Sequence, residues 1–174
     1  MFKKSYYCLV AGLPDLFFNE SKTGIDSLAF RDELKKELNE TDFQLAKLLY
    51  LHVDNQNLLT LLFQPENSFT TGGNFDKSFL ETQITHPNEL PKYMADFILW
   101  VKKNEVKTRF PEGENKLLSL FYEYVLKEKN TFIKRWFTFE LYQKNVSAAL
   151  NCQNFNYPVE NQLHRETPGP LPSG

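Results

Sequence analysis

The sequence predicts an all-α protein, an irregular bundle of five or six helices. Apolar residues recur at helical spacing over most of the chain, strand and helix patterns do not alternate, and only 7 of the 174 residues are glycine. Aromatic residues make up 15% of the chain, which is enough to bury a core and excludes wholesale disorder. We expect one helical domain over residues 1–155, or two similar helical modules, and an extended proline-rich tail over 156–174.

Two helices are predicted in the first third of the chain. They follow a short apolar segment at residues 4–12, which is a strand or a first helix. Apolar residues at near-helical spacing place one helix over 27–38. The other covers 42–63, about 33 Å if unbroken, and Thr41 is its expected capping residue. The polar quartet at residues 54–57 is expected to mark a bend or a break in it.

Three further helices are predicted after the loop that follows. The first is short and lies within residues 76–85. The second begins around Pro91, because proline is favoured in the first turn of a helix. Residues 105–113 read as a polar connection, and the third helix covers 117–128.

The last helix is expected to be long. Asn130 or Thr131 caps it, and its helical pattern fades after Cys152. Its predicted apolar stripe consists of Phe132, Ile133, Trp136, Phe137, Leu141, Ala148 and Leu150.

The motifs in the chain point away from catalysis. Cys8 and Cys152 form neither a metal-binding motif nor a disulfide framework, so we expect reduced, partly buried thiols. The three histidines lie outside any metal-binding or catalytic-triad pattern. The Thr70–Gly73 segment lacks the lysine of a phosphate-binding loop and is expected to be a tight turn. We therefore predict a protein that is not an enzyme and that has no cofactor and no metal.

Charge and hydropathy restrict the partners further. A net charge of −2 and a pI of about 6.0 argue against bulk binding of nucleic acid. The basic stretches at 102–109 and 127–135 begin at predicted helix ends, and they also suit an acidic protein partner. No run of 18 apolar residues occurs, so no membrane-spanning helix is predicted. We expect a cytoplasmic protein that reaches a membrane only through its partners.

Two segments, 48–63 and 135–150, resemble each other. Each places an acidic residue inside an apolar helix and follows it with an asparagine and a further apolar run. A buried carboxylate needs a hydrogen-bonding partner, so these groups are expected to fix helix packing rather than to catalyse a reaction. The alternative for Glu140 is an exposed ion pair with Lys144, one helical turn later. The candidate structural or interaction residues are therefore Asp54, Asn57, Trp136, Glu140 and Asn145.

Four stretches of the chain carry a family resemblance: YYCLVAGLPDL, SLAFRDEL, LPKYMADFI and WFTFELYQKNVSAALN. Together they resemble an uncharacterised bacterial domain family whose genes lie in V/A-type ATPase operons of Bacteroidetes and Chlamydiae. The resemblance covers residues 5–155, and members of the family are usually longer.

The acidic residues followed by asparagine also resemble those of the C-type subunit of V/A-type ATPases. That protein is all-helical, has no active site and is a socket between the rotor stalk and the membrane ring. The resemblance implies a non-catalytic subunit or assembly factor that is peripheral to the inner membrane and binds those ATPase parts. An independent helical adaptor that binds another protein is the alternative.

The 16 phenylalanines exceed what a helical domain of this size is expected to bury. Those on predicted helix stripes include Phe43, Phe97, Phe121, Phe132 and Phe137. Those in or near predicted loops are Phe17, Phe18, Phe69, Phe75, Phe110 and Phe155. We interpret this surplus as an interface, because a contiguous exposed aromatic patch marks a docking surface.

Overall fold

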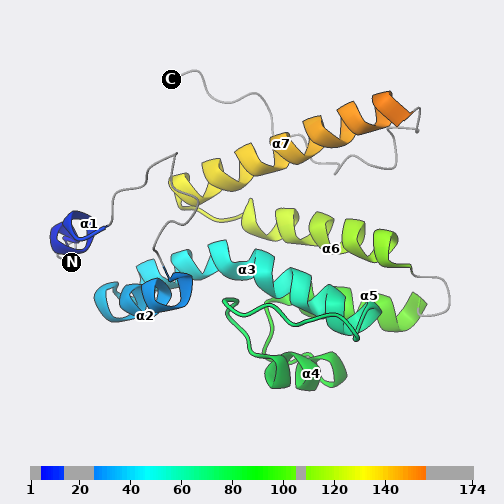
Figure 1. Ribbon diagram of the computed structural model, residues 1–174, viewed down its shortest axis with the longest axis horizontal. Coiled ribbons are helices and arrows are strands. Elements are labelled where there is room, and N and C mark those ends of the chain that lie inside the picture. Colours follow the sequence, from blue (N-terminus) through cyan, green and yellow to red (C-terminus); the bar gives the residue numbers. More distant parts are fainter. Residues whose placement is uncertain (1–4, 14–25, 105–108, 156–174) are drawn as a thin grey trace. The chain divides into compact units, whose positions relative to one another are not determined.

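A computed structural model describes residues 5–13, 26–104 and 109–155 of the chain (Figure 1). The predicted all-α class is confirmed: seven helices make up 76% of these residues, and no strand occurs among them. The chain divides into two compact units, Met1–Asp54 with Thr70–Asn74 and Asn55–Phe69 with Phe75–Gly174. The tail predicted over 156–174 lies outside the described residues.

The first unit holds α1 (Tyr7–Ala11), α2 (Ser27–Glu37) and the beginning of α3 (Glu40–Phe63). The apolar segment near the N-terminus is therefore a helix and not a strand. Asp26 caps α2, since its carboxylate accepts hydrogen bonds from two backbone N–H groups of the first turn. Cys8, predicted to be partly buried, is exposed on α1.

Asn39 caps α3 in place of the predicted Thr41. The Asn39 side-chain oxygen accepts a hydrogen bond from the backbone N–H of Asp42 at 2.9 Å, which satisfies one of the unpaired donors of the first turn. Its amide also donates to the hydroxyl of Tyr6 at 2.8 Å. Thr41 is already the second residue of the helix, because an asparagine two positions earlier makes the better cap.

The polar quartet at residues 54–57 does not break α3, which runs unbroken through it. The quartet is mostly buried, and two of its polar side chains bond to residues outside the helix. The Asn74 amide donates to the carboxylate of Asp54 at 2.6 Å, and the Tyr93 hydroxyl donates to the side-chain oxygen of Asn55 at 2.7 Å. These bonds satisfy groups that would otherwise compete for the helix backbone.

The second unit holds the end of α3 together with α4 (Lys77–Thr85), α5 (Lys92–Asn104), α6 (Phe110–Val125) and α7 (Thr131–Phe155). The apolar residues that recur at helical spacing in α5 are all buried and form its core face, namely Tyr93, Met94, Phe97, Ile98 and Val101. Aromatic and aliphatic side chains of α5, α6 and α7 form most of this core, and its fully buried members include Met94, Phe97, Ile98, Leu117, Phe121 and Phe137.

The α6 helix begins at Phe110, within the segment predicted as a polar connection. Pro111 lies in the first turn, where its missing N–H leaves no helical hydrogen bond unmade, and the adjacent Glu112 favours a helix N-terminus. Gly113 is buried against the ring of Phe63, and a Cβ atom at this glycine would lie 2.6 Å from the ring's Cζ. The glycine therefore serves close packing within a helix and not a loop.

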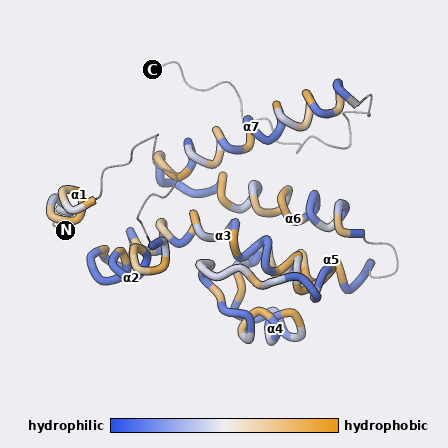
Figure 2. The backbone as a smooth tube through the Cα atoms, in the orientation of Figure 1, coloured by the Kyte–Doolittle hydropathy of each residue, from blue (hydrophilic) through white to orange (hydrophobic). Residues whose placement is uncertain are grey.

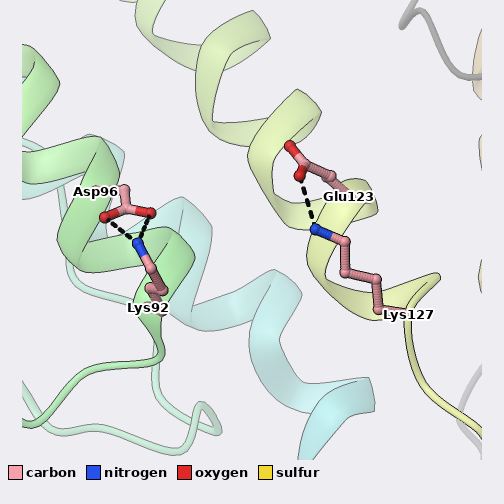
Figure 3. Close-up of polar contacts among 4 residues, drawn as sticks. All are labelled: Lys92, Asp96, Glu123 and Lys127. Atoms are coloured by element: carbon pink, nitrogen blue, oxygen red, sulfur yellow. Dashed lines mark hydrogen bonds and ion pairs between the residues drawn. The ribbon is translucent and has the colours of Figure 1, made fainter.

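The solvent faces of α5 and α6 carry ion pairs between residues one turn apart (Figure 3). Lys92 Nζ lies 2.6 Å from Asp96 Oδ2, and Lys127 Nζ lies 2.7 Å from Glu123 Oε1. The four side chains are between 44% and 82% exposed, so the pairs contribute little to stability. They identify these faces as ordinary solvated surface. Among the described helices, none combines the length and the apolar character needed to cross a bilayer.

Candidate functional site

The α7 helix presents apolar side chains on two different faces. The first face belongs to the core: Ile133, Phe137 and Leu141 follow one another at one-turn intervals and are at most 3% exposed. The ring of Phe137 meets the ring of Phe121 from α6 edge-on, with centroids 5.4 Å apart. This face therefore packs against α6. Asn130 caps the helix, since its side-chain oxygen accepts the N–H of Ile133 at 3.1 Å.

The second apolar face of α7 is exposed to solvent. Its members are between 49% and 63% exposed, and they recur three, four or seven positions apart, so they lie on one side of the helix. The rings of its first two members lie 6.2 Å apart. Figure 2 shows apolar residues recurring along the length of α7. We call this face the α7 stripe, and it consists of Phe132, Trp136, Phe139, Val146 and Leu150.

The exposure of the α7 stripe corrects the core predicted for this helix. Phe132, Trp136 and Leu150 were predicted to share one apolar stripe with Phe137 and Leu141, but they lie on a different face of the helix and are exposed. The reason is that α7 carries more apolar residues than one face can hold, and α6 covers only one of its two faces.

The phenylalanines predicted as an interface are not the exposed ones. Phe75 stacks on Phe79 with ring centroids 5.0 Å apart, and Phe110 meets Phe63 edge-on at 6.2 Å. Together with Phe69 they are only half-exposed. The aromatic surplus thus lies on a helix face and not in these loops. Phe17, Phe18 and the side chain of Phe155 lie outside the described residues.

An open groove between α6 and α7 adjoins the α7 stripe. The two helices are close where α6 ends and α7 begins, and they diverge toward the start of α6 (Figure 1). The groove has a volume of about 1020 Å³, and Phe139 and Val146 of the stripe help to line it. Glu114 and Leu118 from α6 and Lys144 from α7 line it as well. Apolar and charged groups therefore meet at one concave surface, which is typical of a site for another protein segment.

Glu140 ties α7 to α6 beneath this surface. Its carboxylate accepts a hydrogen bond from the Tyr122 hydroxyl at 2.9 Å. Burial of Tyr122, together with the charge of Glu140 and the hydrogen bond to it, raises the pKa of this tyrosine well above its ordinary value of 10.0. The tyrosine therefore stays protonated and holds the carboxylate, which is a structural arrangement and not an activated nucleophile.

We expect the Tyr122→Phe variant to lose less stability than the wild type when the pH is raised into the alkaline range. Because the pKa of Tyr122 is higher in the folded than in the unfolded protein, its contribution is complete below about pH 10 and is lost as the pH rises toward the folded pKa. Above about pH 10 the free energy of unfolding of the wild type should fall by up to about 1.4 kcal/mol per pH unit relative to the variant. Urea titrations on either side of about pH 10 measure this difference, and parallel curves would contradict it.

The five candidate residues lie in both units. Asp54 belongs to the first unit, where it is fully buried and bonded by Asn74. The other four belong to the second unit: Asn57 is buried on α3, whereas Glu140 and Asn145 are half-buried on α7. Trp136 alone among them is a member of the α7 stripe.

Neither Phe139 nor the groove was predicted from the sequence. The sequence does contain a signal for the α7 stripe, since residues 132, 136, 139, 146 and 150 follow a helical repeat of their own. A second helical repeat in the same segment forms the core face of α7. The spacing alone does not show which of the two faces packs against another helix.

No metal site is formed within the described ranges, because no group of three or more histidine, cysteine, aspartate or glutamate side chains there could hold a metal ion.

Comparison with known protein families identifies a match to the family described as "Protein of unknown function (DUF2764)", which covers residues 3–169. No curated protein and no solved structure matches the chain.

Proposed function

The chain belongs to the DUF2764 family, and we propose that it is a non-catalytic protein-binding subunit or assembly factor of a V/A-type ATPase. Its binding surface is the α7 stripe with the adjoining α6–α7 groove. It acts at the cytoplasmic face of the inner membrane, bound through the rotor stalk and membrane ring and not through a membrane span of its own.

The observation that supports a binding role is the exposure of large apolar side chains along about five turns of one helix. Phe132, Trp136 and Phe139 are large, are each about half exposed or more, and are of the aromatic types that are enriched at protein interfaces. Isolated exposed apolar residues need no explanation, but five on one face of a single helix do. Leu99 on α5 is an example of the isolated kind and is 55% exposed.

The choice of an ATPase as partner is supported by the sequence resemblance. Four stretches of the chain, which begin at residues 6, 27, 90 and 136, resemble the family encoded beside V/A-type ATPase genes. The acidic-and-asparagine pattern of α3 and α7 resembles that of the C-type ATPase subunit. Under this proposal Asp54, Asn57, Glu140 and Asn145 hold the helices in register, and Trp136 contacts the partner. The Tyr122–Glu140 bond agrees with such a packing role.

Affinity capture from the native host tests the proposal. Wild-type chain carrying a tag should recover V/A-type ATPase subunits in a constant ratio. Phe139→Ser should reduce that recovery at least about tenfold, since central aromatic anchors contribute about 2 kcal/mol or more to binding. Leu99→Ser is the matched control and should leave recovery unchanged. An intact, active ATPase that never contains the chain would contradict the proposal.

An independent helical adaptor is the second candidate, because the α7 stripe by itself does not say which protein covers it. In that case capture recovers a different partner and no ATPase subunits, and Phe139→Ser still abolishes the recovery. The two candidates thus differ in the identity of the captured protein and share the same contact surface.

A further inference from the structure

The α7 stripe has the spacing of a coiled-coil seam once Gln143 is added to it. Gln143 is exposed, and it lies four residues after Phe139 and three residues before Val146, on the same side of α7. Positions 132, 136, 139, 143, 146 and 150 then follow one another at alternating intervals of four and three residues. Two helices that carry this repeat pack their side chains into each other along their whole length. The row of side chains therefore suits a second helix as its occupant.

The first half of this row is aromatic and the second half is not. In chain order it reads Phe132, Trp136, Phe139, Gln143, Val146 and Leu150. Facing positions pack best when a large side chain meets a smaller one, because each layer of the contact then fills evenly. The row therefore selects a helix whose small side chains lie opposite the rings and whose large ones lie opposite the second half.

A second copy of α7 in the antiparallel direction has this order of side chains. It packs about a two-fold axis level with residue 141, so that the contact is the same surface on both copies. The facing pairs are Phe132 with Leu150, Trp136 with Val146, and Phe139 with Gln143. Every position of the row meets another position of the row, and every ring meets a smaller side chain. In this register the helix is its own complement.

The polar Gln143 is also satisfied by a second copy. The two Gln143 side chains lie on either side of the axis, about 6 Å apart along the helices. A primary amide carries both donors and an acceptor, so two such amides can bond to each other. A single polar residue in an apolar seam fixes the register of the helices at some cost in affinity.

The charges of α7 do not oppose the pairing. None of the positions in the row is charged, and Lys134 and Lys144 project well away from it. The two Arg135 side chains would lie about 18 Å apart along the helices. The two Glu140 side chains lie near the axis, but each carboxylate accepts the hydrogen bond of Tyr122 in its own chain and is held toward α6.

The area of the contact is that of a weak dimer. The members of the α7 stripe are between 49% and 63% exposed, and an aromatic side chain covers about 150–250 Å² when it is fully buried. Pairing of two stripes would therefore bury on the order of 1,000 Å² in total, which is the lower limit for a specific interface. We expect a reversible dimer that forms at micromolar concentrations and leaves the stripe open in more dilute solution.

We propose that the free chain forms an antiparallel homodimer in which the α7 stripes of two copies cover each other. This inference goes beyond the proposed function, since it needs no ATPase. Both associations use the α7 stripe, so a copy that is paired with another cannot bind the ATPase through that face at the same time.

Sedimentation equilibrium of the purified full chain tests the pairing. Between about 1 and about 200 µM the chain should show a reversible equilibrium of monomer and dimer. Phe139→Ser should weaken the dimer at least about tenfold, and the matched Leu99→Ser on α5 should change it less than about twofold. Phe139 and Leu99 are 61% and 55% exposed, so far-UV circular dichroism of both variants should match the wild type.

Disulfide trapping tests the direction of the helices. Phe132→Cys and Leu150→Cys are made in separate chains with tags of different size, both with Cys8→Ser because Cys8 is exposed. Under mild oxidation a mixture of the two should give the mixed disulfide, because the two positions face each other. Neither variant alone should cross-link, because identical positions lie about 27 Å apart along the helices, whereas a disulfide needs Cα atoms within about 7 Å.

Three results would overturn the inference: a chain that stays monomeric over the whole concentration range, a dimer that Phe139→Ser leaves intact, or variants that each cross-link with themselves. The last result would identify a parallel pair. Failure of the proposed function looks different, since the dimer would still form and cross-link as expected while capture from the host recovers no ATPase subunit.

Discussion

Phe121→Ala is expected to lower the free energy of unfolding by about 3–5 kcal/mol, the range for removing a fully buried phenylalanine from a core. Phe121 is 0% exposed and lies where three helices of the second unit meet. Its ring centroid is 5.7 Å from that of Tyr93 on α5 and 5.4 Å from that of Phe137 on α7. The substitution removes both ring contacts and leaves a cavity that rigid helices cannot fully close.

Urea denaturation followed by circular dichroism measures this loss. Leu99→Ala is the matched control, because Leu99 is a large apolar residue of the same unit that is 55% exposed, and it should cost no more than about 0.5 kcal/mol. A loss below about 1.5 kcal/mol for Phe121→Ala, well under the range for a buried phenylalanine, would mean that the three helices do not converge on this ring.

Asp54→Ala is expected to destabilise the first unit by about 2–4 kcal/mol, because it removes the acceptor of the half-buried Asn74 amide and opens a void at a fully buried position. Asp54 is 0% exposed. The amide of Asn74 donates to its carboxylate at 2.6 Å and to the backbone oxygen of Lys47 at 3.0 Å, and this holds the 70–74 loop against α3. Gly73 lies so close that any side chain there would collide with the carboxylate.

The matched control for this prediction is Asp54→Asn. It preserves the shape of the side chain and one oxygen that can accept from Asn74, so the free energy of unfolding should fall by only about 1–2 kcal/mol. Both variants can be compared with wild type by chemical denaturation. If Asp54→Ala were no more destabilising than Asp54→Asn, the carboxylate would not be what holds the loop.

Local signals were sufficient to predict most of the helices. The helix near Pro91 was predicted correctly because a proline at the helix start and a strong apolar stripe agree there, although the helix begins at Lys92, directly after the proline. The sequence failed where distant contacts decide. Asp54 and Asn55 stay in a continuous helix because Asn74 and Tyr93, which are 20 and 38 residues away, bond to their side-chain oxygens. The start of α6 was missed although Pro111 and Glu112 are local signals of a helix N-terminus. The packing of Gly113 on Phe63, which explains a glycine inside the helix, is invisible in local composition.

The candidate site was predicted only in part, for the same reason. Trp136 was singled out from the sequence and does lie on the exposed face, but its neighbours Phe132 and Phe139 were assigned to the core or overlooked. Spacing along α7 defines two apolar rows, and only the packing of Phe137 against Phe121 shows that the other row is left at the surface. An excess of phenylalanine predicts an interface without locating it.

Oxidative labelling of the two tryptophans tests most directly whether the α7 stripe is the contact surface. Trp136 is 49% exposed on the stripe, whereas Trp100 stacks on Phe97 of α5 and serves as the internal reference. In the complex recovered from the native host, the oxidation rate of Trp136 should fall several-fold relative to the free chain while that of Trp100 stays the same. An unchanged rate at Trp136 with the partner still bound would contradict a role for this face in binding.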